Sequence, residues 1–342
     1  MADWRVWLGL GVSVVAVYWT LRGVNLGEVW RALRAAHPLP ILAAMGLHIG
    51  VLWLRALRWR YLTLGLREGG LPPGALFRAT SVGFMSMNIL PLRLGELIRP
   101  WLLARETGVG ASAALGTCVL ERAIDFSCVA AVAAMLVWRR ADALPGWVQS
   151  GAGLFGALAL VPLLLAVALR VRRETTLAAL ARATRWLPGS LGGRVREGVN
   201  ELCRGVAALR GGGSLLMVAV HSLLIWGLVI PATFALAMLA FDLPLPPSEL
   251  GLASYTLLVF IALAIAAPSA PGFLGVYHFA AREALALSGI SSATAVACGT
   301  AAHISFWLPI TAVGVVCAFL SGARPADLAQ AGVGKAASDR LR

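Results

Sequence analysis

Between Asn88 and Asp125 the chain reads NILPLRLGELIRPWLLARETGVGASAALGTCVLERAID. Six ionisable side chains of this stretch lie within apolar sequence: Arg93, Glu96, Arg99, Glu121, Arg122 and Asp125. On insertion scales each would cost about 2.5 to 3.5 kcal/mol at the centre of a lipid-facing helix, so they must face protein, water or one another. Several are spaced three or four residues apart, as Glu96 and Arg99 are, which places them on one helical face. Ionisable groups at membrane depth indicate by default a path for a substrate or an ion.

The composition around this stretch is that of a polytopic membrane protein. Of 342 residues, 59% are hydrophobic and 13% are charged, against about 45 to 50% and about 25% in soluble proteins. The net charge of +13 comes from arginines that gather beside apolar spans, and no nucleic-acid recognition fold accompanies them. We therefore expect an anionic membrane surface, and no nucleic acid, as the partner of these charges.

The cysteines give no sign of a disulfide or a metal site. No paired or metal-ligand spacing relates Cys118, Cys128, Cys203, Cys298 and Cys317. Four of them lie in apolar spans, where a thiol behaves as a small hydrophobic group. Glu121 and Asp125 could ligate a metal, but Arg122 between them opposes a cation. We expect no metal and no cofactor.

Pro91 divides the apolar run at residues 75–105. Proline cannot continue a helical hydrogen-bond ladder and biases Leu90 away from helix, so we predict a hairpin of two half-helices. The alternative is one proline-kinked helix. The following span, Ser112–Trp138, carries Glu121 about 14 Å from its start at 1.5 Å per residue, near the middle of the ~30 Å hydrocarbon core.

For the chain as a whole, we predict an all-α fold of six full spans and two re-entrant helical hairpins. The full spans are Val6–Leu21, Leu39–Leu57, Ser112–Trp138, Trp147–Leu169, Ser214–Ala240 and Ser291–Leu320. The second hairpin, Leu250–Leu287, is broken at Pro268–Gly272. An amphipathic helix with Asn25 and Glu28 in a capping-box pattern follows the first span.

The two halves of the chain repeat this order. Pro91–Gly95 matches Pro271–Gly275, and we predict one membrane domain at residues 1–320 with repeats at 1–140 and 141–320, followed by a flexible tail at 321–342. The basic linker at 170–212 and the cluster of Arg55, Arg58, Arg60 and Arg67 indicate the cytoplasmic side. Both termini are then cytoplasmic and the repeats inverted, in a bacterial-type plasma membrane.

The predicted site is a midplane anion site between the two hairpins. The second half-helices would point unpaired amides at it from near Leu92 and Phe273. Arg93, Arg99 and Arg122 would bind a phosphate, while Glu96, Glu121 and Asp125 hold these arginines when the site is empty. The headgroup of a membrane phospholipid or of an isoprenoid-phosphate lipid fits this chemistry. In the alternative, the charges form an ion-paired clasp between hairpin and span.

Three motifs carry a family resemblance. The first is Asn88, Pro91, Arg93, Gly95, Glu96 and Arg99; the second is Glu121, Arg122 and Asp125; the third is Pro271, Gly272, Leu274 and Gly275. Over nearly its whole length the chain resembles the lysylphosphatidylglycerol synthase transmembrane region, or flippase-like domain, family. The resemblance implies an all-helical, flippase-like fold. In two-domain members this module moves an aminoacylated phospholipid between leaflets; without their soluble aminoacyl-transfer domain, we do not expect that synthesis activity.

The resemblance adds His303 to the expected site and leaves alternatives open. Family members carry an arginine in the last span, where this sequence has His303, so a cationic role there would depend on pH. A membrane-embedded glycosyl- or phosphotransferase, or a scaffold without transport, is an alternative to a transporter. The serine-protease pattern at Ser112 is the weakest of these, because Ser112 lies where a helix N-cap is wanted. A homo-oligomer stays open as a partner.

Overall fold

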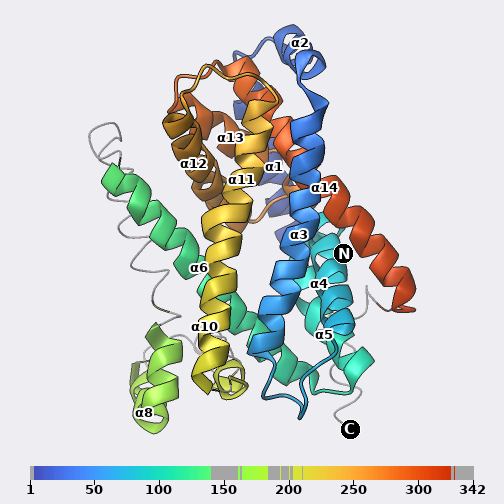
Figure 1. The fold of residues 1–342 in the computed structure, drawn as a ribbon, viewed down its shortest axis with the longest axis vertical. Helices are drawn as coiled ribbons and strands as arrows, with labels where there is room; N and C mark the ends of the chain where they lie inside the picture. Colours follow the sequence, from blue (N-terminus) through green and yellow to red (C-terminus); the bar gives the residue numbers. More distant parts are fainter. Residues whose placement is uncertain are drawn as a thin grey trace. The chain divides into compact units, whose positions relative to one another are not determined.

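A computed structural model describes residues 4–139, 164–183, 203–209 and 211–324, with single positions 161, 193, 200 and 327. These residues form helices and no strands, which confirms the all-α prediction for the part of the chain described. In chain order (Figure 1) the elements are α1 Trp4–Leu21, α2 Leu26–Ala35, α3 Pro38–Leu62, α4 Pro73–Ile89, η1 Pro91–Arg93, α5 Gly95–Thr107, α6 Ala111–Arg139, α8 Arg173–Ala183, α10 Gly211–Ser222, η3 Leu223–Val229, α11 Ile230–Leu239, α12 Pro247–Ala266, η4 Pro271–Phe273, α13 Val276–Ala286 and α14 Ser292–Leu320.

Four described helices are long and apolar enough to cross a membrane: α3, the continuous helix Gly211–Leu239, α12 and α14. A fifth candidate is the pair α1 and α2, which are bent by 84° at their junction. The helix α6 is as long as α14, at 29 residues, but holds Glu121, Arg122 and Asp125. Most of the predicted span Trp147–Leu169 and much of the basic linker at 170–212 lie outside the described residues. The described part of the chain is thus all-helical, with four to five candidate membrane spans.

The chain forms two compact units that interleave along the sequence. The first unit is Met1–Trp53, Ser81–Gly95 and Leu224–Gly322, and the second is Leu54–Thr80, Glu96–Leu223 and Ala323–Arg342. Several helices, including α3, α4 and α5, contribute residues to both. The division into repeats at 1–140 and 141–320 stays a prediction.

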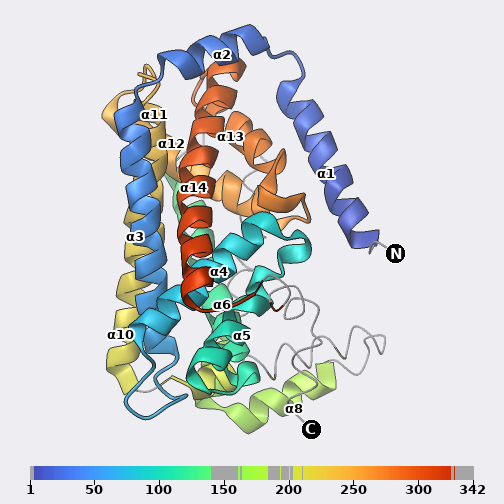
Figure 2. The same cartoon turned by 90° about the vertical axis from the view of Figure 1, so that its right-hand side faces the viewer.

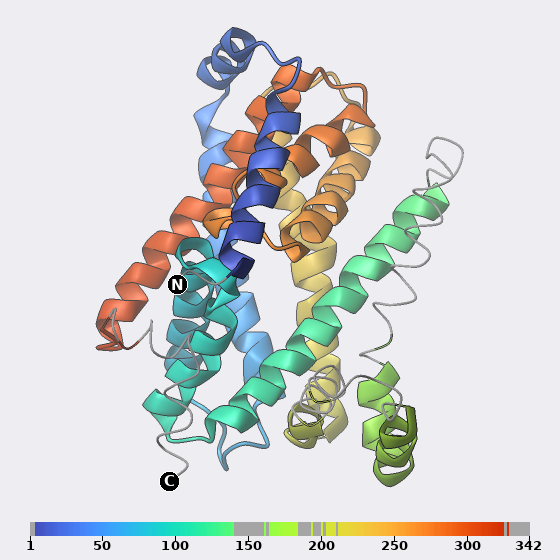
Figure 3. The same cartoon turned by 180° about the vertical axis from the view of Figure 1, so that it is seen from behind.

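In the first unit, α13 packs against α12, α14 and α1, and the dark blue α1 runs beside the orange α13 in Figure 3. A glycine permits the close approach of α1. A Cβ added at Gly275, which has φ +85°, would lie 2.5 Å from the carbonyl oxygen of Ser13. The Ser13 hydroxyl in turn accepts a 2.8 Å hydrogen bond from the backbone N–H of Ala270. The helix α1 therefore fixes the segment that precedes α13.

The short helix α2 lies across one end of α14 (Figure 2). The side chain of Asn25 caps α2 by accepting a 2.9 Å hydrogen bond from the N–H of Gly27, and its amide donates weakly to Glu28 at 3.4 Å. The cap predicted from the sequence is therefore present, although it uses the second helical N–H and not the third. The apolar face of α2 buries Val29 against Ala297 and its neighbours on α14.

The region around Pro91 is a hairpin and not a kinked helix. The helices α4 and α5 are separated by η1. At the far end of the pair, Arg78 donates from Nε and Nη2 to both carboxylate oxygens of Glu106, at 3.1 and 2.6 Å. Near the turn, a Cβ at Gly95 would overlap the carbonyl oxygen of Gly83. Two contacts at opposite ends show that α4 and α5 run antiparallel.

In the second unit, α6 packs against α10 and the later part of α3. The segment 203–209 also lies against α6, because a Cβ at Gly205 would overlap the carbonyl oxygen of Gly116. The backbone N–H of Gly65, just after α3, donates to the carbonyl of Ala208 at 2.8 Å. The end of α3 is thereby held close to α6, where the charged side chains of both helices meet.

Candidate anion site and helix breaks

Two acidic residues on α6 form the base of the candidate site. Glu121 and Asp125 are one helical turn apart and share a face. Glu121 is 0% exposed and Asp125 is 5% exposed. An unpaired buried carboxylate is strongly unfavourable. Both acids therefore require cationic partners from the surrounding helices of this unit.

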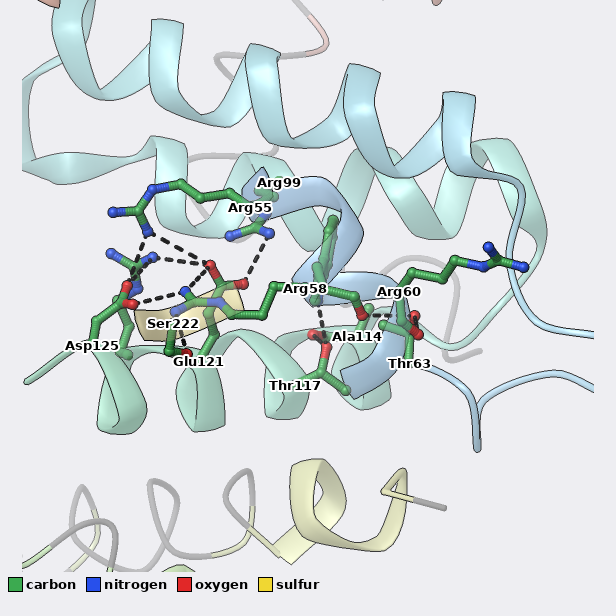
Figure 4. Close-up of polar contacts among 12 residues, drawn as sticks. Arg55, Arg58, Arg60, Thr63, Arg99, Ala114, Thr117, Glu121, Asp125 and Ser222 are labelled. Atoms are coloured by element: carbon green, nitrogen blue, oxygen red, sulfur yellow. Dashed lines mark hydrogen bonds and ion pairs between the residues drawn. The ribbon is translucent and has the colours of Figure 1, made fainter. Parts of the chain in front are cut away.

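The helix α3 supplies two of these partners. Nη2 of Arg58 lies 2.9 Å from Oε1 of Glu121 and 2.7 Å from Oδ1 of Asp125. Nη1 of Arg55 lies 3.1 Å from Oδ2 of Asp125 and 3.9 Å from Oε1 of Glu121. Both arginines are buried, and Figure 4 shows their guanidinium groups gathered at the two carboxylates. Each bridges both acids.

The other two partners come from α5 and α6. Nη2 of Arg99 lies 2.9 Å from Oε2 of Glu121. Nη2 of Arg122 lies 2.9 Å from Oδ2 of Asp125 and 3.3 Å from Oε1 of Glu121. Arg99 is 5% exposed, whereas the side chain of Arg122 is 31% exposed. We name Arg55, Arg58, Arg99, Arg122, Glu121 and Asp125 the buried arginine cluster.

Neutral side chains orient the arginines. The guanidinium carbon of Arg99 lies 3.9 Å from the ring centre of Trp59, a cation–π contact. The indole N–H of Trp59 donates to Oγ1 of Thr117 at 2.8 Å, which fixes the ring. Nη1 of Arg58 donates to Oγ of Ser222 on α10 at 3.1 Å. Three helices besides α6 thus fix the cluster.

The cluster holds an excess of positive charge and unused hydrogen-bond donors. Counted over its six named residues alone, the cluster has four arginines and two carboxylates, a net charge of +2. Within the described residues, Nε of Arg58 and Nε of Arg99 have no hydrogen-bond partner. Nη2 of Arg99 forms an ion pair with Oε2 of Glu121, but the angle between them is unsuitable for a hydrogen bond. Chemically, this arrangement is suited to an anion.

The first unit contains the two helix breaks, which have positive φ at two corresponding positions. After Pro91, Leu92 and Arg93 have φ of 59° and 56°; after Pro271, Gly272 and Phe273 have φ of 70° and 60°. Left-handed conformations at non-glycine residues are uncommon and cost about 1 to 3 kcal/mol each. The match ends there, because Leu94 is helical with ψ −21° whereas Leu274 is extended with ψ 135°.

The two breaks also contact each other within this unit. The guanidinium carbon of Arg93 lies 6.0 Å from the ring centre of Phe273. A Cβ at Gly272 would lie 3.2 Å from the carbonyl oxygen of Asn88, and the Asn88 amide donates to Thr311 on α14 at 3.0 Å. The segment before Pro91 therefore packs on the segment after Pro271.

His303 lies against the second break. Its Nε2 is 2.8 Å from the carbonyl oxygen of Gly272, so the Nε2–H tautomer would donate to that oxygen. Its ring centre is 4.6 Å from that of Tyr277 and 4.9 Å from that of His278. The polar contact of His303 is thus with a backbone carbonyl oxygen.

The predicted site residues therefore fall into two groups. Asn88, Pro91, Arg93, Gly95, Pro271, Gly272, Gly275 and His303 belong to the first unit; Glu96, Arg99, Glu121, Arg122 and Asp125 belong to the second. Arg99 pairs with Glu121 and not with Glu96, which forms no ion pair within 4 Å to a described residue. Because α5 begins at Gly95, Arg93 precedes the helix that carries Glu96. Glu96 itself occupies the first turn of α5, where an anion was expected to bind.

The sequence analysis missed Arg55 and Arg58. It placed them at the end of a span that stops at Leu57 and assigned them to the cytoplasmic side. The structure continues α3 to Leu62 and buries both in the cluster, so they are not surface charges. Their spacing of three residues, which matches the spacing of partners on one helical face, was the signal available.

Possible metal ligands do not gather in the described part of the chain. No group of three or more histidine, cysteine, aspartate or glutamate side chains suited to a metal ion occurs there. The cluster acids instead contact arginines. Ser112 is inside α6, which begins at Ala111, so it is not the N-cap that the sequence suggested.

Comparison with known proteins supplies a family. The profile of the lysylphosphatidylglycerol synthase transmembrane region matches residues 6–314. A UPF0104 membrane protein of the archaeon Methanothermobacter thermautotrophicus is 27% identical over 298 residues, covering 75% of this chain and 85% of that protein. No solved structure matches.

Proposed function

Because the chain belongs to the family of the lysylphosphatidylglycerol synthase transmembrane region, we propose that it is a flippase-like membrane protein that binds the phosphate of an anionic lipid headgroup and moves that lipid between leaflets. The lipid is a membrane phospholipid or an isoprenoid-phosphate lipid. The headgroup binds at the buried arginine cluster. This proposal extends the expected site by Arg55 and Arg58 and keeps Arg99 and Arg122 as phosphate ligands.

The observation that carries the proposal is that, among the described residues, four largely buried arginines gather around two acids. Arginine presents planar, bidentate donors that match phosphate oxygens. A cluster serving only as a clasp would be more stable with balanced charges, because an uncompensated buried charge is costly. The number of arginines and the unused donors on Arg58 and Arg99 both favour a ligand.

We also propose the membrane arrangement expected from the sequence: six full spans and two re-entrant hairpins in an inverted repeat, with cytoplasmic termini. Its support is the equal length of α6 and α14 and the positive φ at corresponding positions of the two breaks. In this arrangement η1 and η4, which contact each other, lie at membrane depth, where broken backbone must be surrounded by protein or water. Asn88, Arg93 and the break glycines then line the path of the lipid.

The experiment compares the melting temperature of the purified protein with and without anionic phospholipid in detergent, for wild type and for Arg99→Lys combined with Arg122→Lys. Lysine keeps the charge but loses the bidentate fork. A ligand at 100 times its dissociation constant stabilises its protein by about 2.7 kcal/mol. We expect the lipid-induced shift to fall in the variant. Arg139→Lys, at the exposed end of α6, is the matched control and should keep the full shift.

Two results would oppose the proposal. An equal lipid-induced shift in wild type and the double variant would exclude these arginines as headgroup ligands. A large loss of lipid-free stability in the variant, with no lipid-induced shift in wild type, would identify the cluster as a clasp. Translocation of a fluorescent lipid in vesicles containing the protein, relative to empty vesicles, then tests transport separately from binding.

A further inference from the structure

One side of α6 stays accessible beside the buried arginine cluster. Leu115, Val119, Arg122 and Phe126 follow one another at intervals of four, three and four residues, which places them on one helix face. Phe126 is 41% exposed, the side chain of Arg122 is 31% exposed, and Leu115 and Val119 are half-buried. Arg122 is therefore a charged residue on an otherwise apolar, accessible face. We name these four residues the α6 outer face.

Arg122 is held differently from the other arginines of the cluster. Its Nη2 lies 2.9 Å from Asp125 and 3.3 Å from Glu121, both on its own helix. Within the described part of the chain, no hydrogen bond or ion pair connects Arg122 to another helix. Arg58 and Arg99, by contrast, are buried and pair across helices with Glu121. The Arg122 guanidinium can therefore turn outward while both acids keep an arginine partner.

Two features of the α6 outer face determine what it can bind. In the proposed arrangement α6 crosses the membrane, so this face meets the hydrocarbon region, where an ionisable side chain is rare and indicates a functional site by default. The partner that suits Arg122 is an anionic group, because its planar donors match phosphate oxygens. Phe126 lies one helical turn away, about 6 Å along the axis at 1.5 Å per residue. A single molecule that contacts both must carry an anionic group beside a hydrocarbon chain, as a membrane lipid does.

From these observations we infer that the α6 outer face is a docking surface for one anionic lipid, with Arg122 at its phosphate and Phe126 against its hydrocarbon chain. This inference rests on the proposed function and deepens it, because it assigns the side on which the lipid enters. The headgroup passes from Arg122 to the cluster behind it, where Nε of Arg58 and Nε of Arg99 make no hydrogen bond with the described residues. A water-soluble phosphate has no chain and would gain nothing from Phe126.

The test places a photoreactive residue on the α6 outer face. The full chain, with p-benzoylphenylalanine in place of Phe126, is reconstituted in vesicles of digalactosyldiacylglycerol, a neutral lipid without phosphate. Phosphatidylglycerol with the same acyl chains is the minor component. Irradiation cross-links the lipid beside this position, and mass spectrometry measures the ratio of the two lipids attached. We expect phosphatidylglycerol to be enriched about tenfold or more over its share of the vesicle, because it gains a charge-assisted hydrogen bond.

Ala131 supplies the matched control position. It is exposed on the same helix, but it lies five residues beyond Phe126 and on a different side of α6. The same photoreactive residue at this position should attach the two lipids in the ratio of the vesicle. Equal enrichment at Phe126 and Ala131 would overturn the inference, because it would show a general attraction of anionic lipid to a basic protein.

Substitutions at Arg122 test its part as the phosphate contact. In Arg122→Gln the enrichment beside Phe126 should fall to the vesicle ratio, whereas Arg122→Lys should keep part of it, because lysine keeps the charge without the fork. Arg139→Gln removes the same charge at the exposed end of α6 and should keep the full enrichment. Unchanged enrichment in Arg122→Gln would overturn the inference. If Arg122→Gln fails to fold, the comparison of Phe126 with Ala131 in the wild-type background decides alone.

Failure of the docking surface can be told apart from failure of the proposed function. If phosphatidylglycerol is not enriched beside Phe126 but still raises the melting temperature through Arg99 and Arg122, the headgroup reaches the cluster by another route. Only the inference is then overturned. If phosphatidylglycerol is neither enriched nor stabilising, both the inference and the proposed function are overturned.

Discussion

Nη2 of Arg58 lies 2.9 Å from Oε1 of Glu121, and both side chains are fully buried. The same carboxylate lies within 4 Å of Arg55, Arg99 and Arg122. One carboxylate thus lies close to four guanidinium groups. Loss of the acid and loss of one arginine should therefore affect stability differently.

Removing the acid should therefore cost more than removing an arginine. Glu121→Gln raises the net charge of the cluster from +2 to +3, and breaking a buried pair costs about 3 to 5 kcal/mol. Arg122→Gln lowers the charge to +1 at a partly exposed position, and should cost about 1 kcal/mol or less. The measurement is thermal unfolding in detergent. Equal losses in the two variants would contradict the account of a cluster with excess positive charge.

A second prediction concerns Gly272, where the break has a φ of +70°. Gly272→Ala should destabilise for two reasons: left-handed strain of about 1 to 2 kcal/mol and contacts of the new methyl at 3.0 Å from Nε1 of Trp307 and 3.2 Å from the carbonyl of Asn88. Gly289→Ala is the control, with φ +74° and open space. The difference in melting temperature reports the contacts of the new methyl group with Trp307 and Asn88. If the two variants have the same melting temperature, these contacts contribute nothing to stability.

The third prediction tests the attachment of α1 to the second break. Ser13→Ala leaves the N–H of Ala270 without the hydroxyl it donates to, and a buried unsatisfied donor costs about 1 to 3 kcal/mol. Ser305→Ala is the matched control, because the Ser305 hydroxyl donates only to Ala302 in its own helix. Melting curves of the two variants should separate. A Ser305→Ala variant as unstable as Ser13→Ala would show that the attachment is unimportant.

The fourth prediction concerns the proposed arrangement across the membrane. A cysteine introduced by Ser248→Cys, in a background without the five native cysteines, should react with an impermeant maleimide from the external side. A cysteine introduced at Gly69, in the turn after α3, should react from the cytoplasmic side. Labelling of Ser248→Cys from the cytoplasm alone would refute the inverted repeat.

Local signals in the sequence predicted much of the fold. The spans Ser112–Trp138 and Ser291–Leu320 agree closely with α6 and α14, because apolar runs bounded by a glycine turn and a serine cap mark helix ends. Proline at positions 91 and 271 located both breaks for the same reason. The positive φ of Leu92, Arg93 and Phe273 could not be predicted, since those residue types disfavour it and only tertiary packing holds them there.

The candidate site was predicted less completely. Glu121, Arg122, Asp125 and Arg99 were identified as charges that need partners, and the structure brings them together. The local spacing wrongly paired Arg99 with Glu96, because its observed partner is on another helix. For the same reason Arg55 and Arg58 were taken for a basic flank: their acids lie 63 or more residues further along the chain. Contacts at that distance leave no local pattern.

The position of Arg55 and Arg58 near the end of α3 has a consequence for biogenesis. These arginines leave the ribosome well before Glu121 and Asp125, so α3 must enter the bilayer while their charges are uncompensated. Near a helix end, long basic side chains can reach the headgroups, which reduces the penalty. When α6 follows, its carboxylates form ion pairs with these guanidinium groups, which then leave the interface. The order of the helices along the chain thus lets the charged core of the second unit assemble in two steps, each with its charges solvated or paired.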